Sequence, residues 1–144
     1  MIDKMLDHVG IVVPSLEGAM EALTAHLGIE WMGVFEPTLP MRDADRGTRD
    51  VSLRIGLGPA QPPRLELIEA IAGSPWQLDE DRMLLHHLAY YVDDLGADSA
   101  GVAGPCPIEI EGVGAAGDIP RTFTYHIHHG LRFELLERRE APLT

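Results

Sequence analysis

The chain has 144 residues, of which 45% are hydrophobic and 24% charged, as in one compact globular domain. Its net charge of −12 argues against nucleic acid as a partner, because binding to phosphates depends on lysine and arginine. No apolar run approaches the ~18 residues of a membrane span, the charged start excludes a secretory leader, and the single cysteine, Cys106, indicates a reducing cytoplasm.

The first half of the chain predicts a strand, a helix and three further strands. A run rich in Val and Ile at 5–13 ends at Pro14 and predicts the first strand. Ser15 is a candidate N-cap for a helix that ends at Gly28 and carries an apolar residue at each helical turn (Leu16, Met20, Leu23 and Leu27). Further strands are expected at 29–35, 51–57 and 64–70, with a polar loop at 41–48 and a proline-rich turn at 58–63.

The second half repeats this order after a linker at 71–84. A strand is expected at 85–92, followed by a short helix at 94–102 that three nearby glycines weaken. Strands at 106–111, 121–128 and 131–138 complete it. The sequence therefore predicts a single α+β domain of two βαβββ modules, about residues 5–70 and 85–138.

Two short sequences occur once in each half. LDHVGI at residues 6–11 corresponds to LHHLAY at 85–90, and RLELIE at 64–69 corresponds to RFELLE at 132–137. A histidine followed by a glutamate is thus duplicated, as His8 with Glu66 and as His87 with Glu134.

Strand alternation places these four side chains on the sheet faces opposite the helices. Successive residues of a strand point to opposite faces, and the apolar neighbours of each polar residue take the helix-covered side. Two sheets curled toward each other would gather two imidazoles and two carboxylates in one cleft. This set has no thiolate and favours a divalent Ni, Co, Mn, Fe or Zn ion with positions left for water or substrate. Any one of the four alone is more typical of a structural histidine or a solvent-facing glutamate.

Four arginines lie close together in the first half, at Arg42, Arg46, Arg49 and Arg54. Such a cluster could attract a small anionic substrate despite the negative net charge. A solvated surface is the favoured interpretation of a charge cluster of this kind.

A histidine-rich run near the end of the chain leaves two interpretations open. Tyr125 and His126 alternate, so one of them faces the cleft and the other the helix side. His128 and His129 precede Gly130 and are expected in an exposed turn.

The chain resembles the vicinal oxygen chelate superfamily over about residues 5–138. The similar segments are LDHVGIVV at 6–13, LELIE at 65–69, HHLAYYVDDL at 86–95 and GLRFELL at 130–136. The family includes glyoxalase I, methylmalonyl-CoA epimerase, extradiol dioxygenases and bleomycin or fosfomycin resistance proteins. The resemblance implies the glyoxalase/bleomycin resistance/dioxygenase fold, in which two sheets form a cleft around one divalent metal ion. Its ligands would be the residues at the matching positions, His8, Glu66, His87 and Glu134.

Within this family the second segment is most similar to the epimerases and glyoxalases. These are isomerases or lyases in which a metal ion polarises a carbonyl while a base removes the proton beside it. The resemblance gives Glu134 the roles of ligand and base. It makes Asp45 the candidate opposing base, although the epimerases carry Glu-Gln-Gly where this chain has Asp45-Arg46-Gly47. Glu66 matches the glyoxalases, whereas epimerases often have Gln there.

The resemblance also implies a thioester or hemithioacetal substrate and a homodimer. Two alternatives stay open. One is a non-catalytic binding protein of the antibiotic-sequestering type that uses the same cleft. The other is an Fe(II) extradiol dioxygenase with His8, His87 and Glu134 as its ligands and with Tyr125 and His126 nearby.

Overall fold

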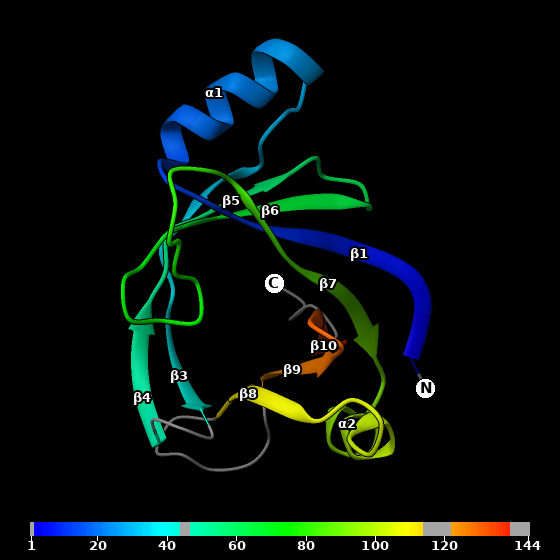
Figure 1. The fold of residues 1–144 in the computed structure, drawn as a ribbon. Coiled ribbons are helices and arrows are strands. Elements are labelled where there is room, and N and C mark those ends of the chain that lie inside the picture. Colours follow the sequence, from blue (N-terminus) through cyan, green and yellow to red (C-terminus); the bar gives the residue numbers. More distant parts are fainter. Residues whose placement is uncertain (1, 44–46, 114–121, 139–144) are drawn as a thin grey trace. The chain divides into compact units, whose positions relative to one another are not determined.

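The computed structural model describes residues 2–43, 47–113 and 122–138 (Figure 1). The contacts of the chain divide it into two compact units. One unit, here called the histidine unit, holds residues 6–39 and 50–89, and the other, the C-terminal unit, holds residues 1–5, 40–49 and 90–144. Among the helices of the described ranges, none is long and apolar enough to cross a membrane.

The histidine unit is built on strands in the order β2-β5-β6-β1-β7 and on helix α1. Its elements are β1 (Ile2–Val13), α1 (Leu16–Leu27), β2 (Gly33–Phe35), β5 (Ile55–Gly58), β6 (Arg64–Glu69) and β7 (Leu84–Val92). Leu16 and Ala19 of α1 pack on Val13 and Leu67, so the odd-numbered residues of β1 and β6 face the helix, as predicted. The even-numbered residues of both strands, among them the predicted ligands, are left for the opposite face.

Helix α1 begins and ends where the sequence predicts. The Ser15 hydroxyl accepts a hydrogen bond from the Gly18 N–H (3.3 Å), which satisfies one of the free donors of the first turn. Gly28 ends the helix with a left-handed φ of 70°, a conformation that glycine adopts without a steric penalty.

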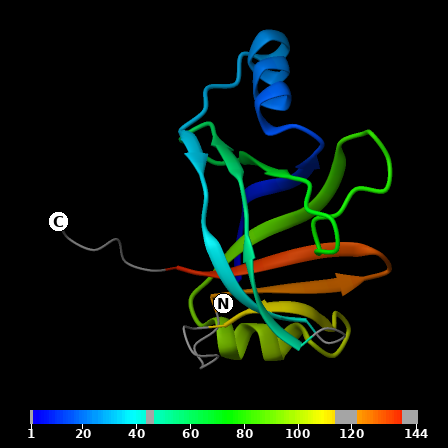
Figure 2. The same ribbon diagram turned by 90° about the vertical axis from the view of Figure 1, so that its left-hand side faces the viewer.

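The C-terminal unit contains helix α2 and strands in the order β10-β9-β8-β3-β4. Its further elements are α2 (Leu95–Val102), β8 (Ile108–Gly112), β9 (Phe123–His128), β10 (Leu131–Glu137), β3 (Thr38–Asp43) and β4 (Gly47–Ser52). β9 and β10 form an antiparallel hairpin (Figure 2). Leu95 of α2 packs with Val92 and Leu135, which assigns the α2-covered face to the residues predicted for it.

The prediction of a polar loop at 41–48 was wrong. Most of it lies in β3 and β4, and Met41 at its start is fully buried. β3 pairs antiparallel with β8, so Met41 lies opposite Gly112. The partner strand comes from the other half of the sequence, and a local polar pattern carries no information about such a distant partner.

Two predicted strands are shorter in the structure. The expected strand at 51–57 is divided between β4 and β5, and Leu53 between them donates its N–H to the Pro37 carbonyl (2.8 Å) rather than to a neighbouring strand. The expected strand at 29–35 is reduced to β2, and Trp31 before it donates its indole N–H to the Met20 carbonyl of α1 (3.2 Å).

Candidate metal centre

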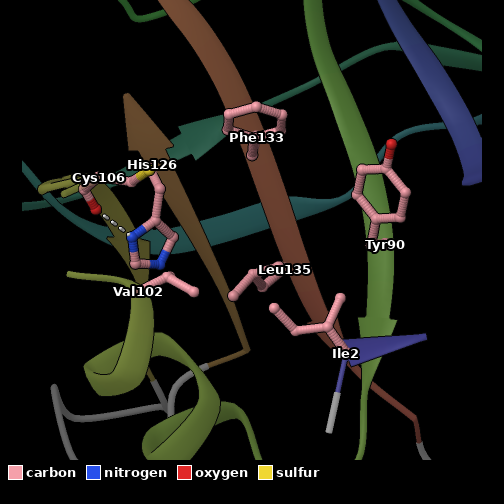
Figure 3. A pocket seen from close by; sticks show the side chains of 7 residues that line it. All are labelled: Ile2, Tyr90, Val102, Cys106, His126, Phe133 and Leu135. Carbon is pink, nitrogen blue, oxygen red and sulfur yellow. Dashed lines mark hydrogen bonds between the residues drawn. The ribbon is translucent and has the colours of Figure 1, made fainter. Parts of the chain in front are cut away.

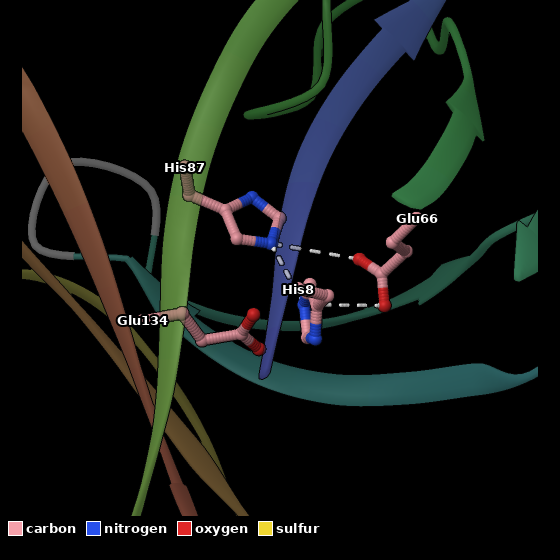
Figure 4. Close-up of side chains that lie close together, drawn as sticks. All are labelled: His8, Glu66, His87 and Glu134. Carbon is pink, nitrogen blue, oxygen red and sulfur yellow. Dashed lines mark hydrogen bonds and ion pairs between the residues drawn. The ribbon is translucent and has the colours of Figure 1, made fainter. Parts of the chain in front are cut away.

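Two histidines meet in the histidine unit, at the strands that carry the first repeated motif. His8 comes from β1 and His87 from β7, and both are buried. Their Nε2 atoms lie 3.3 Å apart, with the two rings nearly perpendicular at 82° (Figure 4). The parity predicted from the sequence thus brings both imidazoles to one point.

Glu66 of β6 directs its carboxylate at the same point. β6 runs parallel to β1, and the Cα of Glu66 is paired with that of Gly10, two residues beyond His8. One carboxylate oxygen lies 3.6 Å from Nε2 of His8 and the other 3.5 Å from Nε2 of His87. The side chain of Glu66 is 17% exposed, so the group opens to solvent on its side.

A carboxylate fixes the tautomer of His8. Nδ1 of His8 lies 2.8 Å from Oδ2 of Asp7, and because a carboxylate only accepts, the ring proton is on Nδ1. Arg64 donates to the other oxygen of Asp7 (2.7 Å) and to the Ala60 carbonyl (2.8 Å). The lone pair of the neutral His8 ring is therefore on Nε2, and the Asp7 contact makes that nitrogen a better metal donor.

The close approach of β1 to the His87 ring depends on a glycine. A Cβ added to Gly10 would lie well under 3.0 Å from three atoms of this ring. The His87 ring therefore occupies the space that any other residue at position 10 would fill.

These donors fit a divalent cation. One ligand atom from each of His8, Glu66 and His87 lies within 4.8 Å of the others. Two nitrogens bound about 2.1 Å from one ion are about 3.0 Å apart at a right angle and about 3.4 Å apart at a tetrahedral angle, which brackets the 3.3 Å between the two histidines. Imidazole and carboxylate without thiolate suit the Ni, Co, Mn, Fe or Zn ions that the sequence predicts.

Glu134, the fourth side chain drawn in Figure 4, belongs to the C-terminal unit and comes from β10. It is 6% exposed and is paired across the hairpin with Tyr125 of β9, so the two share one face. Its role as fourth ligand and base stays a prediction. Asp45, the predicted opposing base, lies outside the described residues.

The structure answers which of Tyr125 and His126 faces the helix. His126 lies on the α2 side, where its Nε2 bonds to Ser99 (2.8 Å) and its Nδ1 to the Cys106 carbonyl (2.8 Å). It forms one wall of an apolar cavity of about 280 Å³ (Figure 3), lined by Ile2, Tyr90, Val102, Cys106, His126, Phe133 and Leu135. His126 is therefore a bonded core histidine, and His128 and His129 are exposed at the turn, as predicted.

The arginines at positions 42 and 54 neutralise acidic side chains. Arg54 donates to Glu17, to Glu36 (3.1 Å) and to Glu69 (3.0 Å). The hydrogen bond from Arg54 holds the pKa of Glu17 below its ordinary value. Arg42 donates to Glu111 (2.7 Å) in the C-terminal unit, and Arg46 lies outside the described residues. These two guanidinium groups support the surface interpretation rather than an anion site.

The chain order and the centre together define a class of protein. β7, α2, β8, β9 and β10 follow one another as βαβββ, and β1 with α1 begins the same order in the first half, into which β3 and β4 are inserted. With the His8, Glu66 and His87 group, this is an α+β domain of duplicated modules with a potential metal site on its strands.

The chain belongs to the Glyoxalase/Bleomycin resistance protein/Dioxygenase superfamily, whose sequence model matches residues 7–103. The fold is similar to that of methylmalonyl-CoA epimerase from Mycobacterium tuberculosis, with a TM-score of 0.68, 23% identity and coverage of 97% of this chain and 94% of that one. A hypothetical protein from Bacillus halodurans gives a TM-score of 0.65, 19% identity and coverage of 96% and 97%.

A third similar structure is a Streptomyces coelicolor methylmalonyl-CoA epimerase variant in complex with 2-nitronate-propionyl-CoA. Its TM-score is 0.63 at 21% identity, and the match covers 92% of this chain and 96% of that one. The comparison with curated proteins gave no match. At these identities the likeness to solved structures concerns the fold.

Proposed function

We propose that this protein is a divalent-metal-dependent enzyme that removes a proton from the carbon beside a carbonyl group, as epimerases and glyoxalases do. The observation that carries the proposal is the convergence of two imidazole nitrogens and a carboxylate within 4.8 Å of one another. A divalent ion bound there supplies Lewis-acid polarisation of a carbonyl oxygen. Two further residues support that site. Asp7 orients the His8 ring through a hydrogen bond, and Gly10 leaves the space that the His87 ring occupies.

Glu134 is the proposed fourth ligand and general base. It occupies the position in the second repeat that Glu66 occupies in the first. Its side chain is buried in β10. A base must lie within hydrogen-bond reach of the proton that it removes. The proposed role of Glu134 therefore requires a bound substrate to present its α proton within that distance of the Glu134 carboxylate. The proposed partner base for a two-base epimerisation is Asp45.

The proposed substrate is a thioester or a hemithioacetal. A Streptomyces coelicolor epimerase with a similar fold binds a CoA thioester analogue, 2-nitronate-propionyl-CoA, which supports a thioester as the first compound to test. Glu66 instead matches the glyoxalases, which supports a hemithioacetal as the second. We further propose a homodimer in the cytoplasm, in keeping with the family and with the single cysteine.

Two measurements on the same preparations test the proposal. Metal content is determined by elemental mass spectrometry, and exchange of the α proton is followed by NMR in D2O with methylmalonyl-CoA and a methylglyoxal hemithioacetal. The variants are His87→Ala, Glu134→Gln and Glu66→Gln. Glu30→Gln is the matched control, because Glu30 is exposed in the same unit as Glu66.

We expect one metal ion per chain in wild type and in the control, and loss of the ion in His87→Ala. Glu134→Gln should lose exchange with the substrate, or substrates, for which the wild type shows it. Glu66→Gln should retain exchange if the enzyme is an epimerase, because epimerases often carry Gln there. A wild-type protein that stays metal-free after reconstitution with each divalent ion would reject the proposal in favour of a binding protein. Stoichiometric iron with catechol cleavage would indicate a dioxygenase.

A further inference from the structure

The residue that directly precedes His87 on β7 is also a histidine, His86. His86 is 4% exposed, and its Nδ1 lies 2.9 Å from Nδ1 of His87. Its Nε2 lies 2.8 Å from the carbonyl oxygen of Pro75, in the linker between β6 and β7. The three groups form a chain of two hydrogen bonds that ends on the main chain of the linker.

The direction of both bonds follows from the chemistry of the carbonyl. A carbonyl oxygen only accepts, so the neutral His86 ring carries its proton on Nε2. Nδ1 of His86 is then an acceptor, and the 2.9 Å contact requires the proton of His87 to be on Nδ1. This places the lone pair of His87 on Nε2, the atom that faces Glu66 and His8.

We infer that His86 is a positioning residue that fixes the tautomer and the ring orientation of His87 and joins the metal centre to the linker. The inference rests on the proposed function only for its effect on metal binding. The arrangement parallels that of His8, which is oriented by Asp7, the residue that directly precedes it. In each half, the residue before the ligand histidine is its hydrogen-bond acceptor.

The linker holds the Pro75 carbonyl in place. Trp76 is 1% exposed and stacks on the His86 ring, with 6.1 Å between the centroids and 30° between the planes. The hydroxyl of Ser74 accepts from the Trp76 N–H (3.0 Å) and donates to the Ile71 carbonyl (2.7 Å). The Ile71 N–H in turn donates to the Trp76 carbonyl (3.0 Å). A displacement of this closed turn would therefore be transmitted to His87 through a single ring.

The two ligand histidines differ in the charge of their acceptors. Asp7 presents a carboxylate to His8, whereas His86 presents a neutral nitrogen to His87. A charged acceptor draws the ring proton more strongly and makes the opposite nitrogen more basic. His86 thus sets the direction of the His87 lone pair while leaving that nitrogen a weaker donor than His8.

Long-range ¹H–¹⁵N NMR of the histidine rings in metal-free protein tests the tautomer directly. Wild type should show His87 protonated on Nδ1 and His86 protonated on Nε2. His86→Phe keeps a ring to stack on Trp76 but removes both bonds, and should yield a mixture of His87 tautomers. His86→Asn supplies an acceptor oxygen near the place of Nδ1, and should restore the Nδ1 proton on His87 without the bond to Pro75.

Calorimetric titration with Zn²⁺ or Co²⁺ measures the consequence for the site. His86→Phe should weaken metal binding 10–100-fold, as for other residues that orient metal ligands, and His86→Asn by less. His128→Phe is the control, because exposed His128 makes a similar bond to the Pro105 carbonyl in the other unit. It should bind metal as wild type does.

Two results would overturn the inference. One is a wild-type His87 protonated on Nε2, and the other is an unchanged tautomer and metal affinity in both His86 variants. Should the Phe variant fail to fold, the wild-type tautomer and the Asn variant still decide. A wild type with the expected tautomers but no affinity for any divalent ion would reject the proposed function and leave the role of His86 in orienting His87 standing.

Discussion

The Gly10→Ala substitution tests whether the proposed metal site depends on the space beside Gly10 that the His87 ring occupies. The added Cβ would lie well under 3.0 Å from three atoms of the His87 ring, whereas nonbonded carbon contacts are about 3.5–4.0 Å. To reach that separation the ring must retreat by roughly 1.5 Å, while metal–ligand distances tolerate deviations of only about 0.2 Å. One methyl group should thus remove His87 from the ligand set.

The expected magnitudes follow from this displacement. Metal affinity should fall more than about 100-fold, because loss of a ligand exceeds the 10–100-fold effect of changing its support. The metal-free protein should lose about 1–3 kcal/mol of unfolding free energy through overpacking, which lowers Tm by about 3–10 °C. Titration calorimetry with Zn²⁺ and thermal unfolding in chelator measure the two quantities.

Two further variants separate this clash from a general effect of alanine. Gly101→Ala makes the same change in α2, where an added Cβ meets nothing within 4 Å, and should stabilise the helix by up to about 1 kcal/mol. In a His87→Ala background the Gly10→Ala change should cost little, since its three nearest clashing atoms are gone. Equal destabilisation in both backgrounds, or unchanged metal affinity in Gly10→Ala, would refute the reasoning.

Further predictions concern the metal, its supports and the surface charges. Adding a saturating divalent ion to stripped protein should raise Tm by an amount that grows with the ion concentration, and an unchanged Tm would count against the site. Asp7→Asn should weaken Zn²⁺ binding 10–100-fold in calorimetry, because the proton on Nδ1 of His8 loses its carboxylate; affinity equal to wild type would contradict this. In Arg54→Met the pKa of Glu17 should return toward 4.5. Because that pKa is lowered in the folded protein, its stabilisation is present above about pH 4.5 and lost as pH falls, so the variant should show a shallower loss of stability in acid denaturation; parallel curves would oppose it.

Strand parity explains how the sequence could locate three side chains of the centre. Glu66 stands between Leu65 and Leu67, of which Leu67 packs against α1. His8 is followed by apolar Val9 and His87 by apolar Leu88, and a period of two then leaves the opposite face for each polar group. Alternation alone could not say whether Tyr125 or His126 faces the helix. The bonds from His126 to Ser99 and to the Cys106 main chain decide it, and they join residues distant in the sequence.

The groups that support the proposed ligands were not predicted. Asp7 and His86 precede the two histidines proposed as ligands, and a strand would be expected to turn them to the other face. Each instead lies within reach of Nδ1 of the next residue. The Asp-His and His-His pairs were visible in the sequence, but the acceptors that give them direction, Arg64 and the Pro75 carbonyl, depend on tertiary packing.

The unlike partners of the two histidines show what a duplicated chain gains from being a single polypeptide. A dimer of identical half-length chains would obey strict twofold symmetry, with the same neighbour and the same free space at both nitrogens. Here position 10 is glycine and its counterpart, position 89, is alanine, and Asp7 corresponds to His86. Covalent linkage releases each half from the symmetry constraint, so one substitution changes the surroundings of one histidine and leaves those of its counterpart unchanged. The two sides of the centre can therefore be varied separately, in selection or in the laboratory.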